Sequence, residues 1–352
     1  MPLEFGIATV FALFAGGAGA MLTLILLGAR NSRTGWLAAF VGIFTYGLLA
    51  GLLASLETGP ETAFVIGVLP SLNFLALPFL YFYASFAVGE QIRSRMLHCV
   101  PAIIALIALA VLPDLNRLYL YWLLALQSFL YLFVMLRRVR QYRRQIKQQY
   151  SSLLHIDLDW LQTMLFALLA LGVFDLFIFP LARQVWITPS EAQAAFNFLG
   201  TLYLLWMAGG AISQEFVQVD PQMESKPAPY QKSGLDDDSA QALAAEIHKA
   251  MQDQHLYLEP DLTLSRLAEA AGTSTHITSE VLNKTIGQSF YDFVNQQRIE
   301  TAKHYLAEGS STVLEIAFLS GFNNKVSFNK AFRRFEASTP SEYRRKQQRR
   351  TG

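Results

Sequence analysis

The residues whose types and spacing best suit a binding site lie near the C-terminal end, on the segment 325–335. At 100° per residue, one face of this segment is apolar and should pack inward, with Phe328, Ala331, Phe332 and Phe335. The opposite face is centred on Val326, Lys330 and Arg333, with Asn329 beside it. Such cations neutralise phosphates or read guanine, an amide reads adenine, and an exposed valine contacts a thymine methyl group. An ordinary solvated helix is the alternative, but it explains an outward valine poorly.

The segment 275–285 has a similar arrangement with a weaker outward face. Its inward positions are Thr278, Val281, Leu282 and Thr285, and its outward positions are His276, Ser279, Glu280 and Asn283. The Glu280 carboxylate can accept a hydrogen bond from a cytosine amino group. An acidic residue at this position is more often found on a face that lies near DNA without binding it tightly.

Short helices position both segments. We expect helices over 240–254, 264–271, 275–285, 290–308, 313–319, 325–335 and 340–346. The N-caps are Ser239, Thr263, Ser289, Thr312 and Thr339, the last two with capping-box glutamates at Glu315 and Glu342, while Gly272 and Gly309 end helices. Two short helices joined by a tight turn recur at about 263–285 and 312–335, which is the helix-turn-helix pattern.

The helix 290–308 joins these two units and sets their separation. Its 19 residues span about 28 Å, close to the roughly 34 Å between successive major grooves on one side of DNA. Residues 222–308 carry seven Lys/Arg and thirteen Asp/Glu, whereas residues 309–352 carry nine and three. We therefore expect the second unit to supply most of the attraction to phosphates.

Spaced motifs in this region resemble the AraC/XylS family of bacterial transcription regulators over about residues 262–344. They comprise the helix and turn 264–272, Gly287-Gln288-Ser289-Phe290, Arg298 with Ala302, Ile316-Ala317, Gly321-Phe322, Ser327-Phe328, Phe332-Arg333-Arg334-Phe335 and Thr339-Pro340-Ser341-Glu342-Tyr343-Arg344. Two positions depart from the family pattern. Thr278 stands where a buried leucine is usual, and Ala337 stands where glycine is usual, which is costly only if φ is positive there.

The resemblance implies a seven-helix DNA-binding domain that binds promoter DNA sequence-specifically, often activating transcription through RNA polymerase. By position, the family's base-reading residues correspond to His276, Ser279, Glu280, Lys325, Val326, Ser327 and Lys330. Family members usually carry a soluble sensing domain ahead of this one, so the N-terminal part of this chain looks like a membrane-embedded variant.

The N-terminal part of the chain is apolar in composition. Residues 1–220 contain twelve Lys/Arg and eleven Asp/Glu, against sixteen of each in residues 221–352. A helix needs about 20 apolar residues to cross the hydrocarbon core. We predict seven spans at about residues 3–28, 36–55, 63–89, 96–113, 118–136, 160–182 and 194–213, of which the fourth is the shortest.

Charges in the loops predict the orientation of these spans. Loops after the first, third and fifth spans carry ten Lys/Arg, including Arg30, Arg93 and Arg137, whereas the opposite side carries only Arg117 and Arg183. Because short cytoplasmic loops collect Lys/Arg, we expect an extracytoplasmic N-terminus, a cytoplasmic C-terminus and a bacterial inner-membrane location. The domains are then a membrane sensory domain at 1–215, a linker at 216–238 and the DNA-binding domain at 239–352.

A few polar or small residues stand out within the spans. Asp175 is ionisable at membrane depth and marks either a ligand or ion site or a structural hydrogen bond. Asn73, between Pro70 and Pro78, could line a cavity where the third span is broken, although a tolerated proline kink is equally consistent. The small residues Ala12, Gly16 and Ala20 favour close helix packing within one chain or between two chains of a homodimer.

Catalytic, metal and cofactor sites are not expected. The six histidines have no nucleophile partner, no metal-ligand spacing and no glycine-rich phosphate loop accompany them, and the lone Cys99 cannot form an intrachain disulfide. The sequence predicts an all-α protein in which seven transmembrane helices precede a cytoplasmic domain with two helix-turn-helix units. We interpret it as a non-enzymatic membrane-bound transcription regulator that responds to an unknown signal ligand and contacts membrane lipid. The alternatives are a transporter, or a receptor whose helix-turn-helix domain is a protein-interaction module.

Overall fold

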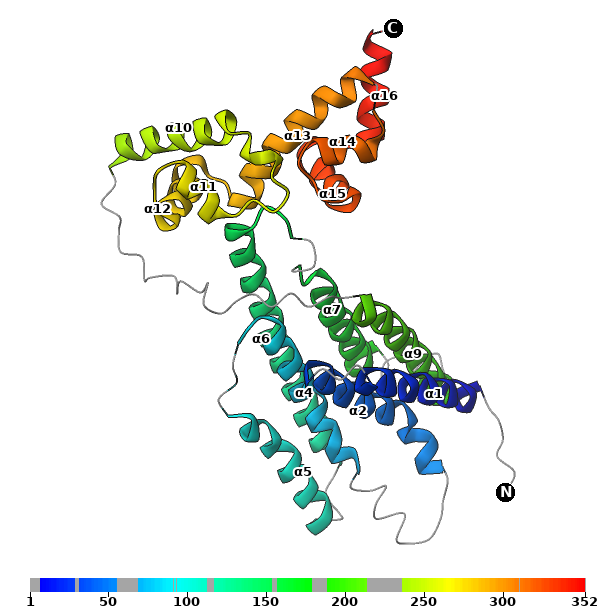
Figure 1. Ribbon diagram of the computed structural model, residues 1–352. Coiled ribbons are helices and arrows are strands. Elements are labelled where there is room, and N and C mark those ends of the chain that lie inside the picture. Colours follow the sequence, from blue (N-terminus) through cyan, green and yellow to red (C-terminus); the bar gives the residue numbers. More distant parts are fainter. Residues whose placement is uncertain are drawn as a thin grey trace. The chain divides into compact units, whose positions relative to one another are not determined.

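The computed structural model describes residues 7–28, 32–55, 69–90, 92, 94–112, 117–153, 157–178, 189–213, 236–309 and 311–351. Within these ranges the regular elements are helices, together with an isolated antiparallel bridge between Tyr150 and Thr263. The expected all-helical class is confirmed. The chain forms two compact units (Figure 1), the first from Met1–Arg140 and Leu158–Gln218, the second from Gln141–Asp157 and Val219–Gly352.

The first unit contains helices at each of the seven predicted apolar stretches. They are α1 (Ile7–Gly28), α2 (Ser32–Ser55), η1 (Leu69–Leu72), α4 (Asn73–Ala87), η2 (Arg95–Cys99), α5 (Val100–Val111), α6 (Arg117–Gln149), α7 (Asp159–Val173), the π-helix η3 (Phe174–Ile178) and α9 (Pro189–Ser213). The α6 helix continues beyond this unit, because its residues from Gln141 onward belong to the second one. Pro70 lies in η1, and Pro78 lies inside α4 without ending it.

Three helices among the described residues are long and apolar enough to cross a membrane. They cover Thr9–Gly28, Tyr119–Gln149 and Asp159–Phe177. The remaining apolar helices are shorter, at Thr34–Leu49, Asn73–Ala87, Arg95–Val111 and Ala194–Met207. The three long helices indicate membrane association, while the seven-span count and the orientation stay predictions. The loop arginines Arg30, Arg93 and Arg183 and the predicted linker residues 216–235 lie outside the described residues.

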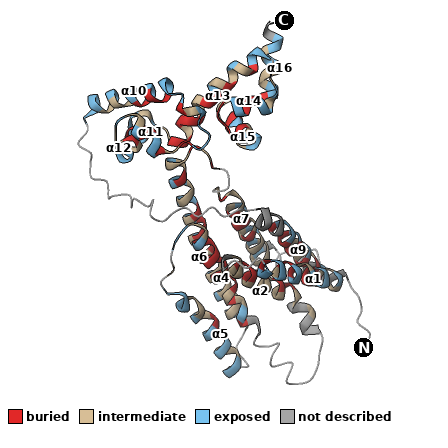
Figure 2. Cartoon of the chain, in the orientation of Figure 1, coloured by how far each residue is buried: buried red, intermediate tan, exposed pale blue. Residues whose placement is uncertain are grey.

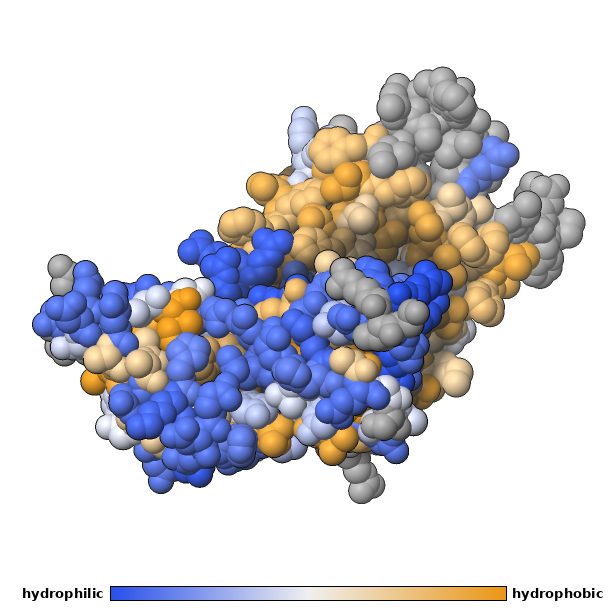
Figure 3. All heavy atoms as spheres, turned by 90° about the horizontal axis from the view of Figure 1, so that it is seen from above, coloured by the Kyte–Doolittle hydropathy of each residue, from blue (hydrophilic) through white to orange (hydrophobic). Residues whose placement is uncertain are grey.

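The face of the first unit that is visible in Figure 3 is predominantly apolar. Figure 2 shows that many residues of α5 are exposed. On α5, Ile103, Ile104 and Ile107 are each more than half exposed, and on α6 the same holds for Leu123, Leu126, Leu130 and Phe133. Contiguous apolar surface of this kind is rare on soluble monomers and marks contact with a membrane or another protein. The second unit presents mainly hydrophilic side chains in the view of Figure 3.

Small residues allow α1 to approach α2 closely. Ala12 is buried, a Cβ atom at Gly16 would lie 2.8 Å from Leu49 Cδ2, and a Cβ atom at Gly19 would lie 1.9 Å from Thr45 Oγ1. Of the expected stripe, Ala12 and Gly16 are buried, whereas Ala20 is exposed within the single chain, so packing of Ala20 between two chains stays a prediction. The 3.6-residue period of the helix rotates a strict four-residue repeat off the contact face, and Gly19 occupies the place expected for Ala20.

The second unit consists of short helices whose ends follow the caps read from the sequence. They are α10 (Asp237–Asp253), η5 (Leu256–Leu258), α11 (Leu264–Ala270), α12 (Thr275–Val281), the π-helix η6 (Leu282–Ile286), α13 (Phe290–Glu308), α14 (Val313–Leu319), α15 (Lys325–Glu336) and α16 (Pro340–Thr351). Thr312 and Glu315 form the expected capping box, and Thr339 and Glu342 make the same two bonds. The expected N-cap at Ser239 is wrong, because Asp236 Oδ1 accepts the Ser239 amide at 2.8 Å and starts α10 earlier.

Two apolar clusters form the core of this unit, and α13 contributes to both. Phe290, Phe293 and Val294 join the cluster under α10, α11 and α12. Ile299, Ala302 and Leu306 join the cluster under α14 and α15. The long helix therefore fixes the spacing of the two helix-turn-helix units through side-chain packing at both of its ends.

Candidate nucleic-acid interface

The second helix-turn-helix unit presents α15 as its outward helix. Asn324 caps it, since the Asn324 Oδ1 atom accepts the Ser327 amide at 2.7 Å. Phe328, Ala331 and Phe332 are buried, as the periodicity predicts. This packing turns the opposite face of α15 toward solvent.

The exposed face of α15 contains most of the predicted reading residues of this unit. Val326 is 74% exposed. Lys325, Lys330 and Arg333 are also exposed, while Ser327 and Asn329 are half-buried. An apolar side chain flanked by cations on the second helix of such a unit suits the major groove, where phosphates, base edges and thymine methyl groups lie together.

The first unit presents α12 after the turn at Gly272. Thr263 Oγ1 caps α11 by accepting the Arg266 amide, and Ser274 Oγ caps α12 by accepting the Ile277 amide, both at 3.3 Å. Thr278 is fully buried, and its hydroxyl donates to the Ser274 carbonyl at 2.9 Å. The buried hydroxyl is thus satisfied locally, where the family pattern has leucine.

The reading face of the first unit differs from the expectation at two residues. The Glu280 side chain is 16% exposed and pairs with Lys284 Nζ at 2.6 Å, so it is not the open acceptor that the wheel predicts. Thr285 is exposed and not inward, because the π-helix η6 adds residues per turn and shifts the phase of the face. His276 and Asn283 are exposed and Ser279 is half-buried, with the Asn283 amide donating to the Ser279 carbonyl at 2.7 Å.

Several cations of α13 and α15 form ion pairs with acidic side chains. Lys330 Nζ lies 3.2 Å from Asp157 Oδ2, and Arg334 Nη2 lies 2.8 Å from Asp292 Oδ2. Lys303 Nζ lies 3.0 Å from both Glu300 Oε2 and Glu336 Oε1. Sequence reasoning did not find Asp157 because 173 residues separate it from Lys330.

Among the residues that the structure describes, Arg298 of α13 is the largest fully buried side chain, and it contacts segments next to both helix-turn-helix units. Its Nε atom donates to the Tyr257 carbonyl at 2.7 Å, and its Nη2 atom donates to the Glu259 carbonyl at 2.6 Å. The guanidinium also lies over the Phe322 ring, 5.5 Å from its centroid, at the turn before α15. Burial lowers the pKa of Arg298 to about 10, so the group stays cationic at neutral pH.

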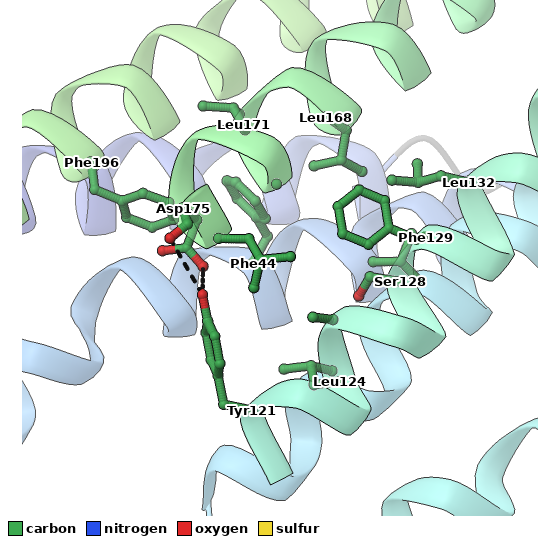
Figure 4. Close-up of a pocket in the computed structure, with 14 residues that line it drawn as sticks. Phe44, Tyr121, Leu124, Ser128, Phe129, Leu132, Leu168, Leu171, Asp175 and Phe196 are labelled. Carbon is green, nitrogen blue, oxygen red and sulfur yellow. Dashed lines mark hydrogen bonds between the residues drawn. The ribbon is translucent and has the colours of Figure 1, made fainter. Parts of the chain in front are cut away.

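In the N-terminal compact unit, formed by Met1–Arg140 and Leu158–Gln218, Asp175 faces an apolar cavity of about 180 Å³ (Figure 4). The carboxylate lies in η3, where a π-turn departs from regular helix, a feature that is frequent at functional sites. Tyr121 Oη donates to Asp175 Oδ2 at 2.9 Å, and Phe44, Phe129 and Leu168 lie around the cavity. Asn73 is not among the residues that line this cavity, so the structure does not join the two predicted ligand residues in one site.

Comparison with known proteins identifies the class to which the C-terminal part belongs. A helix-turn-helix domain family model matches residues 267–346. The C-terminal part of this chain is therefore similar to a helix-turn-helix domain and has homologues among HTH-type transcriptional regulators. No solved structure matches this chain.

The similar proteins are uncharacterised regulators. HTH-type transcriptional regulators of Staphylococcus aureus strains COL and MSSA476 are each 37% identical over 89 residues, which is 25% of this chain and 12% of the relative. The regulator YtdP of Bacillus subtilis strain 168 is 30% identical over 112 residues, which is 30% of this chain and 14% of the relative. The similarity thus covers a small part of each relative and supports a DNA-binding regulator.

Proposed function

We propose that this chain is a multi-pass membrane protein that binds promoter DNA sequence-specifically and changes transcription in response to a membrane or extracytoplasmic signal. The exposed face of α15, with Lys325, Val326 and Arg333 on the second helix of a helix-turn-helix unit, carries this proposal. The matched helix-turn-helix family supports it. In this proposal the bound partner is double-stranded DNA, the protein is not an enzyme, and RNA polymerase is the partner through which it changes transcription.

Phosphate contacts make the first test a measurement of salt dependence. Full-length protein in lipid nanodiscs should bind a fluorescent DNA duplex with an affinity that falls steeply as the salt concentration rises. The reason is that Lys and Arg side chains bound to phosphates displace counterions from the DNA. Lys325→Ala and Arg333→Ala should each weaken binding. A matched control is Lys249→Ala, which removes an exposed cation from α10 and should leave the affinity unchanged.

The same variants separate base reading from phosphate contact. If Arg333 reads a base, Arg333→Ala should cost about 1–3 kcal/mol and relax specificity at one position, whereas a phosphate contact would weaken all sequences alike. Genome-wide occupancy of the intact protein supplies the sites for this comparison. Absence of discrete promoter peaks would reject sequence-specific regulation and favour the interaction-module alternative.

The cavity beside Asp175 supports the sensory part of the proposal. An ionisable side chain at the edge of an apolar cavity suits a small apolar ligand with one hydrogen-bond donor. Asp175→Asn keeps the shape and removes the charge, so it should change the signal-dependent promoter output at equal protein levels in the membrane. The control Asp159→Asn removes a carboxylate from the first turn of α7. An unchanged response in Asp175→Asn would leave Asp175 as a structural partner of Tyr121.

A further inference from the structure

The segment Gln141–Asp157, which follows the apolar part of α6, belongs to the unit that contains the helix-turn-helix domain. Tyr150 forms a bridge with Thr263, directly before α11. The Ser151 amide and hydroxyl both donate to the Leu262 carbonyl, at 3.2 and 2.8 Å. The segment therefore makes backbone contacts with the first helix-turn-helix unit.

Ser151 also takes part in the buried polar network of α13. It is 1% exposed, its carbonyl accepts from Asn295 Nδ2 at 3.1 Å, and its hydroxyl accepts from Arg298 Nη2 at 3.2 Å. Buried polar groups of this kind are costly when their partners are removed. Because Asn295 and Arg298 direct these donors at it, Ser151 is part of the folded core of the unit.

Apolar contacts anchor the same segment on α13. Ile146, Leu153 and Tyr291 form a buried cluster, with Tyr142 and Tyr150 packed against it. Lys147 Nζ lies over the Tyr291 ring, 5.8 Å from its centroid. Polar and apolar anchors thus hold the described part of the segment on the long helix that connects the two helix-turn-helix units.

The segment ends on the second helix-turn-helix unit. Ser152 Oγ accepts from Asn323 Nδ2 at 3.1 Å, immediately before the cap of α15. Asp157 Oδ1 lies 3.1 Å from Arg143 Nε, and Asp157 Oδ2 lies 3.2 Å from Lys330 Nζ. The Asp157 side chain is 16% exposed and that of Lys330 is 57% exposed. The carboxylate is therefore held in place, while the lysine can exchange it for another anion.

We propose that the segment Gln141–Asp157 inhibits DNA binding and so acts as a brake. The Asp157 carboxylate pairs with Lys330 and competes with DNA phosphates for this cation. This inference rests on the proposed function, because it concerns the regulation of the same helix α15. The α6 helix is continuous from Arg117 to Gln149, so the brake is covalently joined to the apolar helix that carries Tyr121 beside the cavity.

The test measures DNA binding by full-length protein in nanodiscs, with a random-sequence 30-base-pair duplex as the probe and fluorescence anisotropy as the readout. Asp157→Asn keeps the side-chain shape and should tighten binding by about two- to fivefold, the range expected for a partly exposed ion pair. Asp253→Asn removes the same charge from α10 and should leave binding unchanged. Asp157→Glu, which keeps the carboxylate, should bind as the wild type does.

A double variant identifies the route of the effect. In a Lys330→Ala background, Asp157→Asn should produce no further tightening, because the competing lysine is absent. Tightening that persists there would overturn the proposal, since the carboxylate would then act by general charge repulsion. Equal binding by wild type and Asp157→Asn would also overturn it.

A crosslink provides a measurement that does not depend on removing the carboxylate. Ser152→Cys and Asn323→Cys, in a Cys99→Ser background, can be joined by a short bismaleimide that holds the segment on the turn before α15. The crosslinked protein should bind the duplex more weakly than the same protein before crosslinking, and equal binding would reject the brake. Absence of binding to the duplex by both the wild type and Asp157→Asn would instead reject the proposed function.

Discussion

Gly321 is the residue at which backbone geometry and packing constrain the interface most tightly. Its φ is +87°, in the left-handed region, and a Cβ atom there would lie 2.3 Å from the Tyr257 carbonyl oxygen. That carbonyl also accepts the Arg298 Nε donor. The turn before α15 therefore depends on a residue without a side chain, both for its conformation and for the approach of the Tyr257 backbone.

We predict that Gly321→Ala destabilises the compact unit that contains both helix-turn-helix units more than Gly272→Ala does. Both glycines have positive φ, but a Cβ atom at Gly272 meets nothing within 4 Å. Gly272→Ala should cost about 1–2 kcal/mol from conformation alone, and Gly321→Ala should exceed it by the cost of displacing Tyr257. Thermal unfolding followed by circular dichroism measures both, and equal losses would contradict the steric argument.

Ala337 shows the opposite case, a side chain in a position that favours glycine. It ends α15 with φ +49° and ψ +20°, so the departure from the family pattern does carry a conformational cost. We predict that Ala337→Gly stabilises the unit by about 0.5–1 kcal/mol. The control Ala271→Gly, at φ −86°, should destabilise instead. A lower melting temperature for Ala337→Gly would show that chain entropy outweighs the strain.

At the scale of elements, contacts between helices in the first unit depend on small residues that sequence spacing located only in part. Gly19 faces Thr45, whose hydroxyl donates to the Val41 carbonyl at 2.7 Å on α2. Gly17, two residues earlier, has nothing within 4 Å of its missing Cβ atom. Gly19 and Gly17 thus differ in whether they face a neighbouring helix.

We predict that Gly19→Ala lowers the thermal stability of the detergent-solubilised protein, because the added methyl group must push α1 away from Thr45. Gly17→Ala should leave it unchanged or raise it slightly, since alanine favours helix by about 1 kcal/mol over glycine. Unfolding temperatures of the two variants decide the comparison. Equal temperatures would mean that the close approach of α1 and α2 contributes nothing to stability.

Helix ends in the second unit follow local rules, and the exceptions have local causes. The predicted helices 290–308 and 313–319 agree with α13 and α14 at both ends. The π-helix η6 was not predicted from the sequence, and its first residue, Leu282, is buried in the core of the unit. This turn exposes Thr285, so a helical wheel drawn at 100° per residue misplaces this residue on α12 and η6.

At the scale of the whole molecule, the proposed function requires the C-terminal unit to face the cytoplasm. The Lys/Arg of the loops motivate that orientation, and α6 bears most of them in its last turns. We predict that a reporter enzyme active only in the periplasm is inactive when fused after Gly352. Fused to a truncation that ends after Asn116, the same reporter should be active. Activity of the full-length fusion would place the DNA-binding unit on the wrong side of the membrane.

The sequence alone determined the helical class, the two helix-turn-helix units and the exposed face of α15. Caps, apolar periodicity and the composition of long apolar stretches act within a few residues, so they can be read without the fold. Only the tertiary structure showed that Asp157 pairs with Lys330 and that Ser151 completes the surroundings of Arg298, across 173 and 147 residues. Ion pairs and buried hydrogen bonds of this kind form only after packing brings distant backbone segments together, and no local pattern encodes which segments will meet.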